Sequence, residues 1–188
     1  MFLRKKLPPA KSEMEFFMKR GFVNALMILA CFLLQTSVFE HIRLAGVRPN
    51  ILIILVVSIA VMRGQNEGML IGFFSGLLLD IFFGTYFGIF AFIYMFSGFC
   101  CGFFNRIYYE EDIVLPLILI GVNDLLFGLL MYVKQGLLHN HRQFFFFFRT
   151  IILPEVVYTV AVGILLYRII LRVHVWMDRR EDRNADIV

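Results

Sequence analysis

Carboxylate and amide side chains inside apolar segments are the residues of this sequence that could do chemistry. Asp80 lies toward the end of one apolar run, Asn123 and Asp124 lie midway along another, and Pro154 and Glu155 interrupt a third. A carboxylate within a bilayer costs about 2.5–3.5 kcal/mol on insertion scales, so each acid is expected to have a partner or access to water. Pro154 is also expected to free a backbone carbonyl about one turn earlier and to kink its helix.

Asp80 has two kinds of possible partner in the sequence. One is the set of N-terminal amides of the helix that follows the turn from Gly84 to Gly88, and the other is the side chain of Arg149. Capping of this turn is the favoured role for Asp80. A relay of protons or of substrate is the alternative.

Glycines accompany Asp80 at a regular spacing of four residues. Small residues four apart share one face of a helix and let another backbone approach closely. Packing inside the same bundle is the favoured interpretation of this face, and docking of a different protein is the alternative. The residues in phase are Gly68, Gly72, Gly76, Asp80, Gly84 and Gly88, and the next apolar run repeats the spacing with Gly98 and Gly102.

The sequence carries no pattern of residues typical of an enzyme. His139 and His141 have no cysteine or carboxylate neighbour at the spacing of a zinc site. Phosphate-binding loops, nucleophile elbows and dinucleotide fingerprints are also missing. Basic residues gather at the termini without interleaved aromatic residues, so they do not indicate a nucleic-acid surface. We therefore expect no catalytic residue, no metal, no cofactor and no nucleic-acid partner.

Composition places these residues in a bundle of membrane helices. Of the 188 residues, 60% are apolar and 17% are charged, whereas soluble domains have about 45–50% apolar and about 25% charged residues. At about 20 residues per spanning helix, the apolar residues suffice for five or six spans and leave no room for another domain. The expected fold class is an all-α integral membrane protein, and most soluble enzyme classes are excluded.

Polar residues divide the sequence into six apolar segments, each an expected transmembrane helix. The second segment is short for a 30 Å hydrocarbon core and the fifth is interrupted by polar residues. The first lacks a convincing small-x-small cleavage site, so we expect an uncleaved helix. The segments are 21–39, 49–62, 68–84, 86–104, 113–133 and 144–168, within a transmembrane domain of residues 21–172 between a basic cytoplasmic segment, 1–20, and a cytoplasmic tail, 173–188.

The distribution of lysine and arginine predicts the orientation. With six spans, 13 of the 18 basic residues fall on the side that holds both termini, and 5 fall on the other side. Retained positive charge marks the cytoplasmic side. The sequence therefore predicts a multi-pass protein of the cytoplasmic membrane with both ends inside, and an odd number of spans is disfavoured because it would export one basic terminus.

Several stretches of this sequence resemble the sequence pattern of the rod shape-determining protein MreD family. The resemblance covers most of residues 22–172 and includes the length, the six-span layout and Pro154 in the last helix. Two positions depart from the family's usual pattern, because Asn50 stands where an aspartate is usual and Tyr158 stands where an asparagine is frequent. The matching stretches are Arg48-Pro49-Asn50 at the start of an apolar run, Gly72-Phe73-Phe74-Ser75-Gly76-Leu77-Leu78-Leu79-Asp80, and then Gly84, Gly88, Ala91, Phe92 and Tyr94.

The resemblance implies a non-enzymatic membrane component of the bacterial elongation machinery, the elongasome, which maintains rod shape and directs lateral peptidoglycan synthesis. The expected direct partner is MreC, a single-span protein, whose helix would bind the glycine rows. Through the assembly the partners are MreB, RodZ, and RodA with its transpeptidase. Pro49 and Asn50 join Asn123, Asp124, Pro154 and Glu155 as polar or helix-breaking residues expected to have a structural role in the membrane.

The family is also similar in fold to the substrate-binding S components of energy-coupling factor vitamin transporters, which supplies the alternative function. An S component usually docks its coupling subunit through two alanines four apart in the first helix. The first apolar run here has no such pair, and the outer loop from Glu40 to Arg48 lacks ligands for a vitamin. The sequence therefore favours the scaffold over the transporter.

Overall fold

The computed structural model describes residues 10–42, 46–84, 87–108, 113–139 and 144–185, and this part of the chain is mostly helical. Six helical segments follow the six apolar segments of the sequence. Two of them contain a turn of π-helix, and one ends in a 3₁₀ turn. The elements are α1 (Ala10–Leu33), η1 (Leu34–Val38), α2 (Phe39–His41), α3 (Ile51–Arg63), α4 (Gln65–Phe83), α5 (Ile89–Gly102), η2 (Phe103–Ile107), α6 (Val114–His139), α7 (Phe144–Phe147), η3 (Phe148–Ile152) and α8 (Leu153–Ala185).

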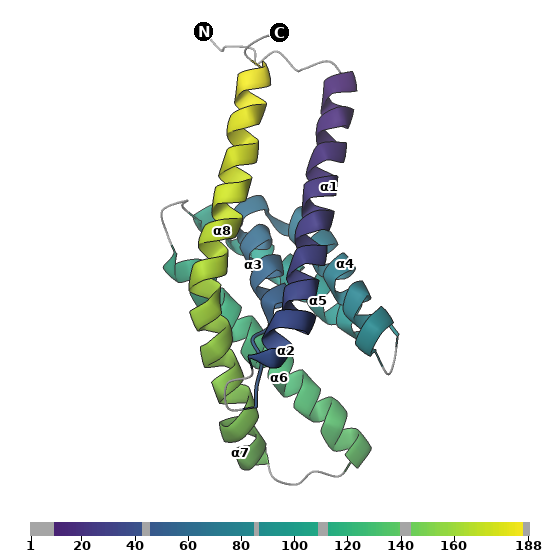
Figure 1. The fold of residues 1–188 in the computed structure, drawn as a ribbon, viewed down its shortest axis with the longest axis vertical. Helices are drawn as coiled ribbons and strands as arrows, with labels where there is room; N and C mark the ends of the chain where they lie inside the picture. The colour runs from purple at the N-terminus through teal and green to yellow at the C-terminus, as the bar shows by residue number, and fades with distance from the viewer. Residues whose placement is uncertain (1–9, 43–45, 85–86, 109–112, 140–143, 186–188) are drawn as a thin grey trace.

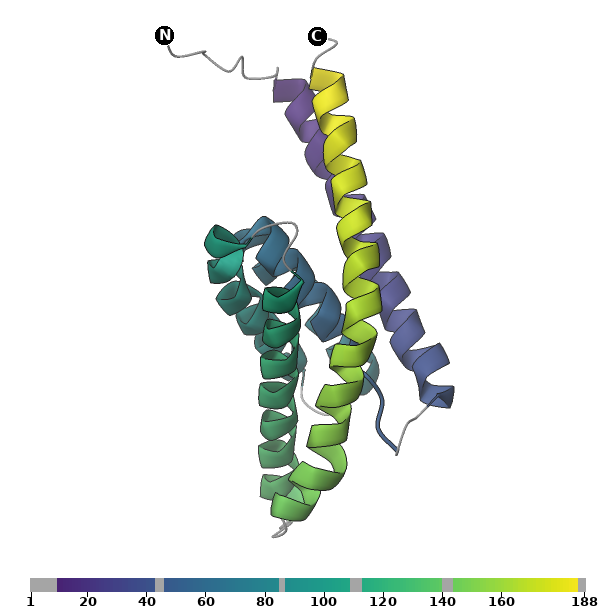
Figure 2. The same cartoon turned by 90° about the vertical axis from the view of Figure 1, so that its left-hand side faces the viewer.

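The first and last segments are the longest. α1 continues through η1 into α2, and α7 continues through η3 into α8. The start of α1 and the end of α8 lie at the same end of the molecule and project beyond the other helices (Figures 1 and 2). α8 thus remains helical as far as Ala185, through most of the segment expected to form a tail.

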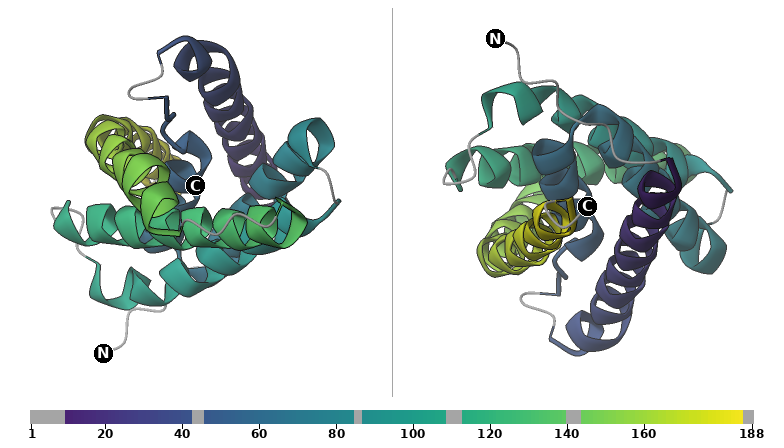
Figure 3. Two further views of the ribbon diagram at one scale, coloured as in Figure 1. Left: turned by 90° about the horizontal axis from the view of Figure 1, so that it is seen from below. Right: turned by 90° about the horizontal axis from the view of Figure 1, so that it is seen from above.

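α3 is the central helix of the bundle. It contacts α1, α4, α5, α6 and α8, and the view along the long axis shows it between α1 and α8 (Figure 3). Every residue from Ile51 to Val61 is buried. A helix surrounded in this way can be apolar on all sides, which explains why this segment shows no alternation of polar and apolar faces.

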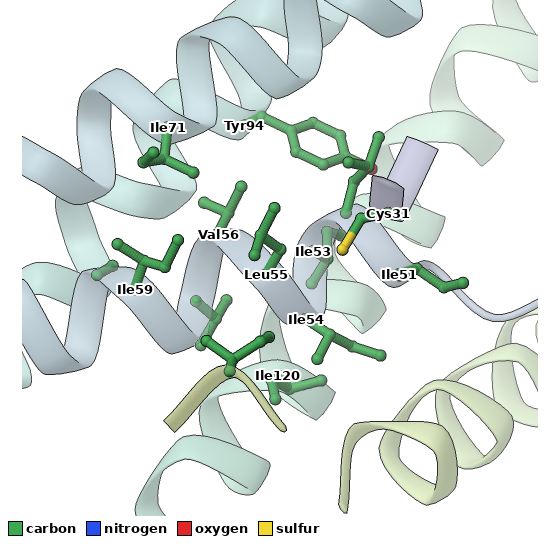
Figure 4. Close-up of a cluster of buried hydrophobic side chains, with 14 of the residues drawn as sticks. Cys31, Ile51, Ile53, Ile54, Leu55, Val56, Ile59, Ile71, Tyr94 and Ile120 are labelled. Carbon is green, nitrogen blue, oxygen red and sulfur yellow. The ribbon is translucent and has the colours of Figure 1, made fainter. Parts of the chain in front are cut away.

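The apolar core is built around α3. Ile51, Ile54, Leu55 and Ile59 are completely buried and point in different directions, toward residues of the neighbouring helices. Figure 4 shows the ring of Tyr94 among them, close to the start of α3. Residues on the outward faces of the other helices are exposed and apolar, as expected for side chains in contact with lipid.

The number of membrane spans is not settled by helix length. Five helical segments are long and apolar enough to cross a membrane, whereas α3 has 13 residues and a length of about 20 Å. The expectation of six full spans is therefore unconfirmed. The expected segment boundaries are otherwise close to the helices, since each expected segment overlaps one of them.

α3 nevertheless runs in the direction that a sixth pass requires. Its first turn lies beside Thr159, because the amide of Asn50 donates to Thr159 Oγ1 at 3.1 Å. Its last residue, Arg63, lies 3.5 Å from His174 of α8. Thr159 and His174 are 15 residues apart along α8, so α3 runs parallel to α8 over the whole length of α3.

Candidate functional site

The glycines of α4 form the surface on which α5 packs. A side-chain carbon at Gly72 would collide with the carbonyl of Tyr94, and one at Gly76 would collide with the carbonyl of Phe90. Gly68 faces the carbonyl of Gly98 in the same way. Only glycine lets two helix backbones approach this closely. The two helices therefore form a tight antiparallel hairpin.

The second glycine pair lies on the other side of this contact. Gly98 packs on the backbone of Gly68, and Gly102 packs on the backbone of Gln65 at the start of α4. The glycine face of α4 is thus covered by α5 along its whole length. This face is therefore used for packing within the chain, which was the favoured interpretation of the glycine spacing.

Asp80 connects the two helices at the far end of the hairpin. Its carboxylate is buried, and its two oxygens accept hydrogen bonds from the amides of Phe90, at 3.1 Å, and of Ala91, at 2.8 Å. These amides belong to the first turn of α5, where N–H groups have no partner within the helix and the helix dipole favours negative charge. Of the two partners expected for Asp80, the structure shows the helix amides.

The turn between the helices depends on two more glycines. The amide of Gly84 donates to the carbonyl of Asp80 at 3.0 Å and ends α4. Gly88 precedes α5 with a φ of 97°, a left-handed conformation that other residues rarely adopt. Both glycines therefore shape the turn rather than pack against another helix.

Asn50 is the centre of a second polar site, at the first turn of α3. Its Oδ1 accepts from the amide of Ile53, at 3.3 Å, and from the hydroxyl of Tyr94, at 2.7 Å. The backbone N–H of Asn50 donates to Thr159 Oγ1. Pro49 precedes this cap and is buried; because proline has no N–H and restricts the residue before it, the helix does not extend toward Arg48. One residue thus joins α3, α5 and α8.

Asp124 of α6 completes this site. Its carboxylate is buried, and the side chains of Asn50 and Thr159 lie beside it. Neither carboxylate oxygen makes a hydrogen bond of ordinary geometry. Glu155 of α8 and Arg48 are the charged residues near this group. We call these six residues the α3 cap site: Arg48, Asn50, Tyr94, Asp124, Thr159 and Glu155.

Asn123 points to a different neighbour from Asp124, although the two are adjacent in sequence. Its Oδ1 accepts from Ser97 Oγ at 2.6 Å, and its amide nitrogen donates to Cys101 Sγ and to the carbonyl of Leu119. Ser97 and Cys101 belong to α5. Asn123 therefore holds α6 against α5, while Asp124 faces α3 and α8.

The two π-helical turns lie within the first and last helical segments. In η1, the buried side chain of Gln35 accepts from the amide of Leu52 at 3.0 Å. η3 ends just before Pro154, and the amide of Leu153 donates to the carbonyl of Phe148, five residues earlier. A proline at 154 cannot bond to the carbonyl of Thr150, and the wider turn is a way to accommodate that gap.

Three residues that shape the α3 cap site were not singled out as site residues by sequence analysis. Gln35 and Thr159 are polar residues within apolar runs, and Thr159 follows Glu155 by four residues, which places both on one helix face. Tyr94 was noted only for its family resemblance. A systematic survey of polar residues within apolar runs would have found all three, but not the way in which they meet.

Comparison with known protein families decides where this arrangement belongs. A family model described as rod shape-determining protein MreD matches residues 16–174. The chain belongs to the MreD family. The matched range includes the glycine hairpin, Asp80 and every residue of the α3 cap site. Family membership supports a role in rod shape determination for a membrane protein, and MreD is a family of structural membrane proteins rather than a known enzyme family.

The other two comparisons are negative. No curated protein matches the chain, and no solved structure matches it. The expected similarity to the S components of energy-coupling factor transporters therefore has no support from solved structures, and the transporter alternative is not favoured.

Proposed function

We propose that this chain is a non-enzymatic scaffold of the bacterial elongation machinery, which binds MreC and thereby supports rod shape and lateral peptidoglycan synthesis. The observation that carries the proposal is the match of the MreD family model to residues 16–174. The buried polar groups fit this role, because those of Asp80, Asn50 and Asn123 are used to join helices of the chain to one another.

A partner helix must bind on a face that the bundle leaves open. The glycine face is occupied by α5, so the proposal needs another surface. α1 offers one, because its buried residues Ile28, Cys31 and Phe32 face the core while the opposite side carries large apolar residues. This outer row consists of Phe22, Leu26, Leu29 and Leu33, each between 47% and 72% exposed.

The spacing of the outer row makes it nearly straight along the helix. At about 100° per residue, the 11 steps from Phe22 to Leu33 make three full turns and about 20° more, so the row is nearly straight. The exposed row of α6 from Val114 to Leu130 has steps of four and drifts by about 160°. A straight row is what a second helix can follow, and we propose α1 as the surface for the MreC helix. A row of the same spacing on α5 and η2, formed by Phe92, Phe96, Phe99 and Phe103, is the other candidate surface.

The rest of the proposed assembly follows from this contact. MreB, RodZ, and RodA with its transpeptidase would be reached through the complex rather than by direct binding. We propose that both termini face the cytoplasm. The proposal is supported by the position of the start of α1 and the end of α8 at one end of the molecule (Figure 1) and by the excess of basic residues on that side.

Affinity purification from membranes tests the proposal. The wild-type chain should bring down MreC, and Leu26→Trp and Leu33→Trp should reduce the yield of MreC several-fold, because the larger rings fill the row while remaining compatible with lipid. Val122→Trp and Leu126→Trp on the exposed row of α6 are the matched controls and should leave the yield unchanged.

The outcomes distinguish an error in the proposed scaffold function from an error in the proposed binding surface. If wild-type protein brings down a coupling-factor ATPase instead of MreC, the scaffold function is wrong. If MreC is recovered equally with the α1 and α6 variants, the scaffold remains supported and the α1 surface is wrong.

A further inference from the structure

Asp124 is the feature of the molecule that the scaffold function leaves unexplained. It is 2% exposed, and its carboxylate oxygens make no hydrogen bond of ordinary geometry, although the side chains of Thr159 and Asn50 lie within reach of them. Leaving a buried polar group unsatisfied costs about 1–3 kcal/mol, and more when the group is charged. Asp80 provides the contrast within the same chain, because each of its oxygens accepts from a helix amide.

The surroundings of Asp124 contain more negative than positive charge. The groups around Asp124 come from three parts of the chain. Arg48 and Asn50 precede α3, Tyr94 belongs to α5, and Thr159 and Glu155 belong to α8. Asp124 and Glu155 are carboxylates, whereas Arg48 is the cation whose charge acts on this group in the part of the chain that the structure describes. A buried carboxylate is stabilised by a compensating positive charge, which a bound cation would add to the charge of Arg48.

The atoms around Asp124 determine what could supply this charge. Asn50 Oδ1 is occupied by two donors, so the amide nitrogen of Asn50 is the group left to bond to the carboxylate. Two hydroxyl oxygens stand nearby. Thr159 Oγ1 accepts one hydrogen bond and has capacity left, and Tyr94 Oη donates to Asn50 and keeps its lone pairs. Carboxylate and hydroxyl oxygens suit a proton or a small alkali ion.

We propose that Asp124 and its neighbours in the α3 cap site bind one monovalent cation, H⁺ or Na⁺. The ion balances the second carboxylate and binds the oxygens of Asp124. Since the site joins α3, α5, α6 and α8, an occupied site holds the four helices together, and release of the ion leaves two carboxylates that repel each other.

Infrared spectroscopy of the full-length chain in lipid nanodiscs tests the proton. At neutral pH the wild type should show the carbonyl stretch of a protonated carboxyl group, and Asp124→Asn should lose this band. Glu67→Gln, which removes a carboxylate from the first turn of α4 outside the site, is the matched control and should retain it.

Thermal unfolding in NaCl and in choline chloride of equal ionic strength tests the sodium ion. If the site holds Na⁺, the wild type should be specifically stabilised by sodium, and Asp124→Asn should lose the effect. A band that depends on Asp124 identifies a proton, and a sodium effect that depends on Asp124 identifies Na⁺. The absence of both overturns the proposal.

A second variant keeps the test decisive should Asp124→Asn fail to fold. Glu155→Gln removes the excess negative charge, so Asp124 and Arg48 then balance each other. Cation affinity, followed by the band or by the sodium effect, should fall about tenfold or more. Unchanged affinity in Glu155→Gln would show that charge balance does not hold the ion, and would contradict the proposed site.

Discussion

At the scale of single residues, the polar side chains inside this bundle act mainly as caps for helix ends. Asp80 caps α5, and Asn50 caps α3. In water these amides would bond to solvent, but in a bilayer each unsatisfied backbone group costs several kcal/mol. Short helices with ends inside the membrane domain therefore require polar residues at fixed positions, and these residues need not have any catalytic role.

Replacement of Asp80 separates the effect of its hydrogen bonds from that of its charge. Asp80→Asn keeps one acceptor oxygen for the two amides of α5, whereas Asp80→Leu leaves both without a partner. At about 1–3 kcal/mol for each unsatisfied amide, the leucine variant should be clearly less stable than the asparagine variant in thermal unfolding in detergent. Equal losses would instead indicate an essential negative charge.

Tyr94 and Thr159 allow a matched pair of nearly isosteric changes at the α3 cap site. Tyr94→Phe removes the hydrogen bond to Asn50 but keeps the contact of the ring with Phe127, at 5.6 Å between centroids. Thr159→Val removes the acceptor for the buried amide of Asn50. Each should lower stability by about 1–2 kcal/mol.

The double variant of Tyr94 and Thr159 tests whether the site is one unit. Both single changes act through Asn50, so the losses should not add, and a double-mutant cycle should give a coupling of at least about 0.5 kcal/mol. Additive losses would show that the two contacts are independent.

At the scale of elements, the α4–α5 hairpin depends on the absence of side chains. Gly76→Ala would place a carbon against the backbone of Phe90, which cannot move aside as a flexible side chain could. The helices would have to separate and lose their contacts, so we expect a loss of stability of several kcal/mol and a lower yield of folded protein from membranes.

Gly163 in α8 is the control for this change. A carbon there would meet Leu117 and Ile120 at 3.5 and 3.6 Å, which is ordinary contact. Gly163→Ala should therefore be neutral or stabilising by up to about 1 kcal/mol, because alanine favours a helix. If the two variants behave alike, close packing of the hairpin is not what the row of glycines provides.

Sequence analysis predicted the elements better than their partners. Apolar runs predicted the position of each helix, and the glycine spacing predicted a face for close packing. It could not show that α5 covers this face, because the same spacing also suits an external helix. Nor could it show that Asn50, Asp124 and Thr159 meet, since they are widely separated along the chain and their contact depends on how α3, α6 and α8 are arranged.

At the scale of the whole molecule, the short central helix lies between α1 and α8 and contacts both (Figure 3). α3 is surrounded by five other helices, so its length of about 20 Å does not have to match the thickness of the bilayer. Hydrophobic length, the usual criterion for a span, is informative only for helices in contact with lipid. The number of passes must therefore be tested by determining on which side of the membrane each connection between helices lies.

Labelling of introduced cysteines with a reagent that cannot cross the membrane tests the number of passes. Asn66 and Arg106 are exposed at the end of the bundle that holds both termini, since Gly102 packs on Gln65 and Arg63 lies beside His174. His41 and Phe87 are exposed at the connections that follow α1 and α4, at the other end. In a background without Cys31, Cys100 and Cys101, intact spheroplasts should label His41→Cys and Phe87→Cys but not Asn66→Cys or Arg106→Cys. Labelling of Asn66→Cys together with His41→Cys would mean that α3 does not carry the chain across, and that the two termini lie on opposite sides.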